Sequence, residues 1–491
     1  MLDAIPERSG HAGALDGSEE IELDRPKEEC GVVGISTRGS EAARLAFFGL
    51  YALQHRGQEA AGIAVSDGRA VRLHKDVGLV SQVFDSSALE PLIGGMAIGH
   101  TRYSTTGSSS ERNVQPYVVE TMHGPLGIAH NGNLVNADQL RSKLLERGAG
   151  LQSSSDSEVL ALMLAATEGA TWEDRLAKVM PEWQGAYSLV VISGTKVIAA
   201  RDPWGFRPLS MGRLPSGGHA VASETGALRT LSCTDIREIE PGEIVVMQGD
   251  LARVHRAMEP KERQARCTFE HIYFSRPDAV WDGLSVHQAR QRLGAELAAE
   301  HPVDADVVMP VPDSSMPAAI GYAAASGITY NEGFVKNRYI GRTFIEPTDE
   351  LRRSGVKLKF NTLEENIFGQ RVIIIDDSIV RGTTSGPLIR MVREAGATEV
   401  HVRITCPPIA HPCFFGVDMG TYEELIAHQL GVPEICEHIG ADSLGFLSVE
   451  RMMSALGRAD GYCNACFTGN YPIPVQLSLT GTKQRFDGAL G

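Results

Sequence analysis

The 491-residue sequence lacks any apolar run near the length of about 20 residues that a helix needs to cross a bilayer. Residues 1–29 also lack the apolar core that a secretory signal requires. The usual sequence signs of a membrane-bound or secreted protein are therefore missing. We expect a cytoplasmic protein with no membrane partner.

Positive charge is scarce as well, because 46 Lys and Arg residues face 61 Asp and Glu residues and the formal net charge is −15. A nucleic-acid partner is not expected, since binding to a phosphate backbone relies on an excess of Lys and Arg. Residues 1–29 form an acidic leader with nine acids and three bases. Any site for an anionic substrate must therefore be built from local charge.

A local reversal of charge occurs in residues 336–359, where seven basic residues outnumber three acids. The basic residues are Lys336, Arg338, Arg342, Arg352, Arg353, Lys357 and Lys359. Gly, Pro and Ser residues in the same segment favour a loop over a packed element. A solvated basic face is the ordinary explanation for such a run, and a loop that closes over an anionic substrate is the alternative.

A short apolar segment followed by two acids and a glycine loop carries the most information about function. Residues 372–375 are an uninterrupted β-branched run, as expected for a strand buried on both faces. Residues 387–394 are typical of a helix, which Gly396 would close. The loop between them would lie at the carboxyl end of the strand, where backbone N–H groups and the helix dipole can receive a phosphate group.

Hydroxyl groups reinforce that phosphate site, since the loop contains Thr383, Thr384 and Ser385 directly after Gly382. Asp376 and Asp377 come too early in the chain to contact the same phosphate. We expect their partners to be ribose hydroxyls or a Mg²⁺ ion that carries a second phosphate group.

Residues 371–385 resemble the phosphoribosyl pyrophosphate (PRPP) signature of the type I phosphoribosyltransferases. The resemblance implies a doubly wound parallel α/β sheet, an acid pair that contacts the ribose hydroxyls and the metal, and a basic loop that closes over pyrophosphate. Strand-like runs at residues 305–309, 371–375 and 399–404 fit such a sheet. The PRPP-binding residues that it implies are Asp376, Asp377, Arg381, Gly382, Thr383, Thr384, Ser385, Lys336 and Arg342.

Residues 310–315 follow the first of these strands and resemble the pyrophosphate loop of the same family. By this resemblance Ser314 joins Asp376 and Asp377 around Mg²⁺. A turn built by Asp313 and Ser314 without any ligand is the alternative.

The amino-terminal half contains a second set of motifs, which begins with Cys30-Gly-Val-Val-Gly. On its own, Cys30 would be a small buried residue. The later motifs Gln-His-Arg-Gly-Gln, His-Thr-Arg-Tyr-Ser-Thr, His-Asn-Gly-Asn-Leu and Ser-Asp-Ser-Glu, at residues 54–58, 100–105, 130–134 and 155–158, change that interpretation. In this order they resemble the class II glutamine amidotransferases, which are N-terminal-nucleophile (Ntn) hydrolases with a four-layer αββα fold.

This resemblance implies a role for each motif in the hydrolysis of glutamine. Cys30 would be the nucleophile, and its own free α-amine, with a reference pKa of about 8, would be the base. Asn131 and Gly132 would supply oxyanion donors. Arg102 would pair with the carboxylate of the substrate and Asp156 with its α-ammonium. Taken singly, a surface ion pair and an Asn-Gly turn are the simpler explanations of these residues.

Cys30 departs from this pattern, because 29 residues precede it and its nitrogen is an amide, which cannot serve as a base. We therefore expect residues 1–29 to be a propeptide that is removed between Glu29 and Cys30, by attack of Cys30 on its own preceding carbonyl.

Six of the eight cysteines lie in the second half of the chain, and disulfides are not expected in a cytosolic protein. Cys463 and Cys466 have metal-ligand spacing, although a single C-x-x-C motif is equally consistent with two inert thiols. The segments around Cys267 and Cys413 resemble the iron-sulfur-containing branch of the glutamine PRPP amidotransferases. That resemblance implies a [4Fe-4S] cluster on Cys267, Cys413, Cys463 and Cys466, with a zinc site as the alternative on coordination chemistry. Core packing is expected for Cys233, Cys406 and Cys436.

Together the motifs predict a propeptide (1–29), an Ntn glutaminase domain (30–258), a phosphoribosyltransferase domain (267–470) and a C-terminal tail (471–491). The implied enzyme is a glutamine-dependent amidophosphoribosyltransferase of purine biosynthesis, which converts PRPP to 5-phosphoribosylamine. The family further implies inhibition by purine nucleotides and a homotetramer. The alternatives are a sugar-phosphate amidotransferase, a non-catalytic PRPP-binding regulator and an inactive scaffold.

Overall fold

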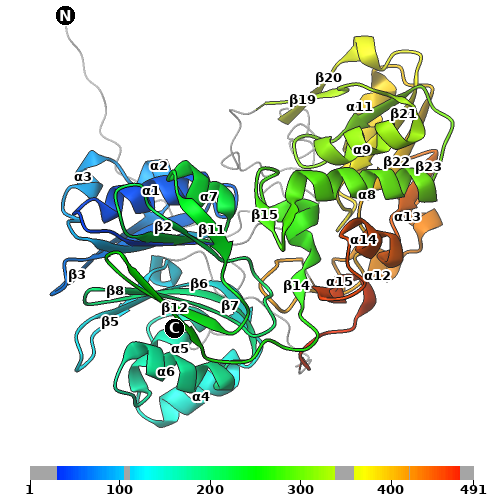
Figure 1. The fold of residues 1–491 in the computed structure, drawn as a ribbon. Coiled ribbons are helices and arrows are strands. Elements are labelled where there is room, and N and C mark those ends of the chain that lie inside the picture. The colour runs from blue at the N-terminus through cyan, green and yellow to red at the C-terminus, as the bar shows by residue number, and fades with distance from the viewer. Residues whose placement is uncertain (1–29, 104–110, 338–358, 420, 476–491) are drawn as a thin grey trace, which may run out of the picture.

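The computed structural model describes residues 30–103, 111–337, 359–419 and 421–475, and it contains three principal sheets. Two of them lie in the first half of the chain and the third in the second half (Figure 1). Within the described ranges, no helix is long and apolar enough to cross a membrane.

The first sheet has seven strands in the order β11-β9-β10-β1-β4-β2-β3. Glycine or alanine residues in β1 and β4 allow helix α1 to pack closely on this sheet, because the ideal Cβ of Gly99 would lie 2.8 Å from Leu50. The strands are β1 (Gly31–Ser36), β2 (Ala60–Ser66), β3 (Val71–Val77), β4 (Met96–Arg102), β9 (Ser210–Arg213), β10 (His219–Ala222) and β11 (Thr234–Glu238). The helices of this layer are α1 (Ala42–Ala52), α2 (Val80–Val83), α3 (Ser86–Leu89) and α7 (Thr225–Thr230).

The second sheet has six strands in the order β13-β12-β8-β7-β6-β5. They are β5 (Tyr117–Val119), β6 (Leu126–Leu134), β7 (Gly185–Ser193), β8 (Lys196–Arg201), β12 (Glu243–Gln248) and β13 (Leu251–Arg256). Its helical layer comprises α4 (Ala137–Glu146), α5 (Asp156–Ala166) and α6 (Trp172–Val179), with short 3₁₀ turns at Glu111–Asn113 and Met180–Glu182.

The two sheets pack face to face, because alternate residues of their strands are apolar on the shared side. Val32, Ile98, Ala129 and Val190 meet in this inner layer, and separate apolar clusters lie beneath the helices on each outer side. The first half of the chain therefore has the four-layer αββα arrangement that its motifs predict (Figure 1).

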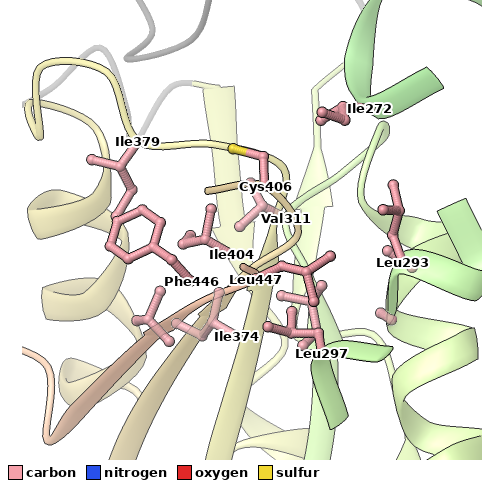
Figure 2. Packing of buried hydrophobic residues seen from close by; sticks show 14 of the residues in the cluster. Ile272, Leu293, Leu297, Val311, Ile374, Ile379, Ile404, Cys406, Phe446 and Leu447 are labelled. Atoms are coloured by element: carbon pink, nitrogen blue, oxygen red, sulfur yellow. The ribbon is translucent and has the colours of Figure 1, made fainter. Parts of the chain in front are cut away.

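The third sheet is parallel, with the strand order β18-β17-β21-β22-β23. Its strands are β17 (Val307–Pro310), β18 (Thr329–Tyr330), β21 (Arg371–Asp376), β22 (Glu399–Ile404) and β23 (Ser443–Phe446). The surrounding helices are α8 (Val286–Glu300), α9 (Met316–Ser326), α11 (Ser385–Glu394), α12 (Ile426–Gln429), α13 (Val432–Ile439), α14 (Val449–Ala455) and α15 (Ala465–Thr468). Figure 2 shows Leu297 facing Ile374, Ile404 and Leu447 in the core of this doubly wound fold.

Smaller elements join these layers. Strands β14 (Arg266–Cys267) and β24 (Tyr462–Cys463) form a parallel pair, whereas β15 (Val280–Trp281) with β16 (Leu284–Ser285) and β19 (Phe334–Lys336) with β20 (Phe360–Thr362) are antiparallel pairs. A π-helical turn spans Glu270–Phe274 and a 3₁₀ turn spans Glu364–Asn366. The pair β14–β24 brings the start of the second half next to its end.

The strands that the sequence predicts in the second half are present, with three differences at element boundaries, of which the smallest is that β21 ends at Asp376 instead of residue 375. Strand β17 runs from Val307 to Pro310 instead of residues 305–309, and helix α11 begins at Ser385 instead of residue 387. Pro387 is therefore the third helical residue, and the first turn tolerates a proline, which lacks an N–H, because an N–H at that position would have no intrahelical partner. The glycine loop is thus two residues shorter than expected, and its last hydroxyl belongs to the helix.

Candidate active sites

The predicted nucleophile Cys30 lies immediately before β1, at the end of the strand pair β1–β4. Gly31 is paired with Thr101, so Cys30 and Arg102 follow at the same end of the pair. Cys30 is 8% exposed, and its Sγ donates a hydrogen bond to the backbone oxygen of Tyr103 at 3.4 Å. Arg102 is buried at the last position of β4.

The two predicted oxyanion residues lie in β6 of the facing sheet. Gly132 has a φ of +145°, and an ideal Cβ there would lie 2.0 Å from the backbone oxygen of Ala186, so only glycine fits. The Nδ2 atom of Asn131 is buried and, among the described residues, has no hydrogen-bond partner. An unsatisfied buried donor costs about 1–3 kcal/mol, and a bound oxyanion would satisfy it.

Asp156 is the first residue of α5 and lies beside the end of β6. Its Oδ2 accepts a hydrogen bond from the backbone N–H of Leu134 at 3.0 Å, and its Oδ1 lies 3.8 Å from Nδ1 of His130. Burial lowers the pKa of His130, only partly opposed by Asp156, so its imidazole is neutral at pH 7. His130 was not among the predicted site residues, although it directly precedes Asn131 in the motif.

The acid pair of the second half stands at the carboxyl end of β21. Asp376 is the last residue of the strand and Asp377 follows it; both are buried. Ser314 Oγ donates to Asp377 Oδ2 at 2.6 Å, and Ser315 Oγ donates to Asp376 Oδ1 at 3.2 Å. The structure therefore brings Ser314 and the acid pair together, as an oxygen-rich group of the kind that Mg²⁺ prefers.

The glycine loop leads from this acid pair into α11. Gly382 has a φ of +75°, which favours glycine, and an ideal Cβ would lie 2.7 Å from Ile426. Thr383 is exposed, whereas Thr384 and Ser385 are buried at the beginning of the helix. The loop thus connects the acid pair to the N-terminus of α11 within eight residues.

Three basic residues of the predicted PRPP site have different positions. Arg381 donates to Glu424 Oε1 at 3.2 Å. Lys336, at the end of β19, forms an ion pair with Asp313 at 2.8 Å, next to Ser314. Arg342 lies outside the described residues, as does most of the basic segment 336–359.

The four predicted cluster ligands come together between β14, β24 and α15. Cys267 is paired with Cys463 in the β14–β24 ladder, and Cys413 packs with Cys463 in a small core. Burial raises the pKa of the Cys466 thiol, and repulsion from Cys463, Cys413, Cys267 and Cys406 raises it further. Four thiols are the donor type that a cluster requires. Their arrangement does not match a metal site, because the described ranges contain no group of three or more His, Cys, Asp or Glu side chains that could hold a metal ion.

The remaining cysteines lie elsewhere. Cys406 is fully buried in the core of the second half (Figure 2). Cys233 is partly buried against the outer helical layer of the first half. The Cys436 thiol donates to the backbone oxygen of Ala441 at 3.3 Å.

A buried arginine that the sequence analysis missed connects the halves. Arg56 Nε donates to the backbone oxygen of Cys30 at 3.1 Å, and its guanidinium binds Glu224 at 2.7 Å and Glu270 at 2.6 Å. Burial alone would raise the pKa of Glu224, but the adjacent His55 and Arg56 lower it to about 2. Arg56 lies within the motif Gln-His-Arg-Gly-Gln, which indicated that this segment is important but could not predict which residues Arg56 contacts.

The chain is similar to known proteins over both of its halves. A family model described as a glutamine amidotransferase domain matches residues 100–230. The chain is 51% identical to an amidophosphoribosyltransferase of Synechocystis sp., over 94% of each chain. It is 48% identical to an amidophosphoribosyltransferase of Bacillus subtilis, over 92% of this chain and 96% of the relative.

Two solved structures share the whole architecture at 47% identity. One is described as the allosteric regulatory enzyme of purine biosynthesis and has a TM-score of 0.87, covering 92% of this chain and 98% of its own. The other is the glutamine PRPP amidotransferase of B. subtilis complexed with ADP and GMP; its TM-score is 0.86, and the match covers 91% of this chain and 98% of its own.

Proposed function

The chain belongs to the amidophosphoribosyltransferase family, and we propose how its residues divide the work of that reaction between two sites. The enzyme is a glutamine-dependent pentosyltransferase that performs the first step of purine biosynthesis. The observation that supports the proposal is the Ser314–Asp377 contact beside a glycine loop, in a chain that also has a buried Cys30 directly before β1.

In the glutaminase site, the Cys30 thiolate attacks the side-chain amide carbon of glutamine. Negative charge develops on the amide oxygen, and the N–H of Gly132 and Nδ2 of Asn131 hold it there. Arg102 pairs with the substrate carboxylate and Asp156 with its ammonium. Collapse of the tetrahedral intermediate releases ammonia and leaves a thioester, which water hydrolyses to glutamate and free Cys30.

The proton for departing ammonia comes from the α-amine of Cys30, which first receives it from the thiol. This assignment requires Cys30 to be the first residue. We therefore propose a cleavage between Glu29 and Cys30, in which the thiol attacks the Glu29 carbonyl, the amide bond breaks to free the α-amine of Cys30, and water hydrolyses the resulting thioester to release residues 1–29. Residues 1–29 lie outside the described residues. Intact-mass measurement of active enzyme tests the cleavage, and full activity with residues 1–29 attached would contradict it.

In the second site, ammonia attacks C1 of PRPP and pyrophosphate leaves, so that 5-phosphoribosylamine forms with inversion at C1. Asp376 and Asp377 orient the ribose through its hydroxyls. Residues 382–385 hold the 5-phosphate through N–H and hydroxyl groups, supported by Arg381. Ser314, Asp376 and Asp377 would hold Mg²⁺, which stabilises the charge of the departing pyrophosphate when it is bound.

The cysteine set is assigned a structural or oxygen-sensing role. Cys267, Cys413, Cys463 and Cys466 would hold a [4Fe-4S] cluster at the junction of β14, β24 and α15, with Cys₄ zinc as the rival. Iron and acid-labile sulfide analysis, together with a visible spectrum, separates them. A colourless, zinc-loaded active protein would overturn the cluster.

The proposed domain limits separate the residues of the two sites. We assign residues 30–258 to the glutaminase and 267–470 to the phosphoribosyltransferase, with 471–491 as a tail. Purine nucleotides are proposed as feedback inhibitors, because the related B. subtilis structure is described as complexed with ADP and GMP. We also propose a homotetramer, as membership of this family implies.

A single assay of the purified protein tests the two-site proposal. With PRPP and Mg²⁺ present, glutamine should yield glutamate and 5-phosphoribosylamine, and Cys30→Ala should abolish this reaction. The same variant should still make 5-phosphoribosylamine from added ammonia, because its second site is intact. Loss of both reactions in correctly folded Cys30→Ala would contradict the division into two sites.

A further inference from the structure

A short segment of the second half lies directly on the oxyanion strand of the first half. This segment, the clamp (residues 413–416), begins nine residues after the end of β22. Asn133 Nδ2 donates a hydrogen bond to the backbone oxygen of Phe414 at 2.9 Å, across a sequence separation of 281 residues. Asn133 is the residue next to Gly132 in β6.

A second contact to the clamp comes from Arg207, which lies between β8 and β9. Arg207, which is 1% exposed, donates from Nε at 3.2 Å and from Nη2 at 2.6 Å to the backbone oxygen of Phe415. Two charge-assisted hydrogen bonds to one buried carbonyl leave it little freedom. Adjacent carbonyls of the clamp are thus each held by a side chain of the glutaminase half.

The clamp also touches the oxyanion glycine itself. Gly416 has a φ of +105°, and its ideal Cβ would lie 3.1 Å from the carbonyl carbon of Gly132 and 3.2 Å from its Cα. Phe415 is stacked on Phe206 with ring centroids 4.4 Å apart, and both pack with Ala186. Ala186 is the residue whose carbonyl confines Gly132 from the other side. The oxyanion glycine therefore lies between β7 and the clamp.

We propose that Asn133 is a positioning residue for glutamine hydrolysis, which keeps the Gly132 N–H aimed at the oxyanion by fixing β6 to the clamp. An oxyanion donor acts only when it is held in place before charge develops. The Asn133–Phe414 bond holds the residue that directly follows Gly132, and the backbone of Gly416, which lies against the Cα and carbonyl carbon of Gly132, opposes displacement of Gly132 toward the second half. This inference rests on the proposed oxyanion role of Asn131 and Gly132.

The experiment compares Asn133→Ala with Asn136→Ala in the full-length enzyme. Asn136 is a matched control, because its Nδ2 donates to the backbone oxygen of Glu182 at 2.9 Å, near the same end of β6 but away from the clamp. Asn133→Ala should lower kcat for glutamine hydrolysis about tenfold, a smaller loss than the roughly 100-fold or greater loss expected for an oxyanion donor itself. The KM for glutamine and the ammonia-dependent synthesis should stay within about twofold.

A second readout separates positioning from a general structural role. Glutamate γ-semialdehyde adds to a cysteine thiol to form a tetrahedral hemithioacetal, whose oxygen occupies the oxyanion position. Its affinity should fall about tenfold in Asn133→Ala, in parallel with kcat. Gly416→Ala, which would press a methyl group toward Gly132, should give the same pattern from the opposite side. Asn133→Gln, which keeps an amide donor, should recover part of the loss.

The outcomes distinguish the proposed oxyanion role of Asn131 and Gly132 from the positioning role of Asn133. Asn131→Ala must weaken the aldehyde strongly; if it does not, the oxyanion assignment falls and this inference with it. If Asn131→Ala weakens the aldehyde while Asn133→Ala leaves aldehyde affinity and kcat unchanged, only the positioning role is wrong. Equal losses of glutamine-dependent and ammonia-dependent synthesis in Asn133→Ala would also overturn that role, because they would indicate damage to both halves.

Discussion

Arg56 and Glu270 form a fully buried ion pair that joins the two halves of the chain, with Nη2–Oε1 and Nη1–Oε2 distances of 2.6 and 2.9 Å. The same arginine donates to the backbone oxygen of Cys30. The position of Cys30, the proposed nucleophile, is therefore connected through one side chain to the first helical turn of the second half. Burying these charges is costly, so each depends on the other for compensation.

Removing the charge of Glu270 should destabilise the protein markedly. Glu270→Gln would remove one of the two buried carboxylates that pair with Arg56 and leave Glu224 to compensate its charge, and we expect about 3 kcal/mol of lost stability. The control is Asp278→Asn, because the Arg276–Asp278 pair is about half exposed and such pairs contribute about 1 kcal/mol or less. Urea unfolding, followed with two probes, measures the free energy of unfolding of both variants. Similar losses in the two variants would contradict the importance of the buried pair.

The acid pair should be required by both nitrogen sources. Asp377→Asn removes a carboxylate that Ser314 contacts and that would help to hold Mg²⁺, so glutamine-dependent and ammonia-dependent synthesis should both fall about 100-fold or more. Asp306→Asn is the control: this acid precedes β17, at the amino end of the same sheet, and binds Arg371. Assays with each nitrogen source measure the effect. A loss confined to glutamine would place Asp377 in the wrong site.

The sequence was sufficient to predict what depends on local pattern. Strand β22 has the predicted limits, β21 extends the predicted run by one residue at its end, and the order of short motifs indicated both folds. These features follow from apolar periodicity and from loop chemistry that stays within about 15 residues.

Contacts between distant segments could not be predicted in the same way. Arg56 and Glu270 are 214 residues apart, and Asn133 and Phe414 are 281 residues apart. A carbonyl acceptor such as that of Phe414 leaves no trace in residue type, because every residue has one. The glutamate and the asparagine were visible in the sequence, but their partners depended on how the two halves pack.

Stability should fall between pH 7 and pH 5 because of His100. Burial, with Arg102 nearby, lowers its pKa from 6.5 to about 3, and among the described residues its Nδ1 has no hydrogen-bond partner that could receive a second N–H. The unfolded chain therefore binds this proton below pH 6.5, whereas the folded chain does not until about pH 3. The stabilising effect is present above pH 6.5, and by pH 5 about 2 kcal/mol of it is lost.

His100→Gln provides the comparison, because glutamine can still donate toward the backbone oxygen of His130 but does not titrate. Its unfolding free energy should drop about 2 kcal/mol less than that of the unsubstituted protein between pH 7 and pH 5. Urea unfolding at half-unit pH intervals measures this difference. Parallel pH profiles for the two proteins would show that His100 is protonated in the folded state as readily as in the unfolded one.

Replacement of Cys466 by serine should remove the proposed cluster, whereas replacement of Cys406 by serine should leave it in place. Both thiols are buried and within electrostatic reach of each other, yet Cys466 lies with Cys463, Cys413 and Cys267. Cys406 packs in the apolar core of the second half (Figure 2), outside the group formed by Cys267, Cys413, Cys463 and Cys466.

Cys466→Ser should therefore eliminate iron and acid-labile sulfide from the purified protein, whereas Cys406→Ser should retain both. Because Cys406→Ser places a hydroxyl in an apolar site, its thermal unfolding midpoint should fall even though its cluster is kept. Anaerobic purification followed by iron and sulfide assays and a visible spectrum decides the matter. Cluster retained in Cys466→Ser, or lost from folded Cys406→Ser, would mean that the ligand set includes the wrong fourth thiol; metal without sulfide in the unsubstituted protein would favour zinc.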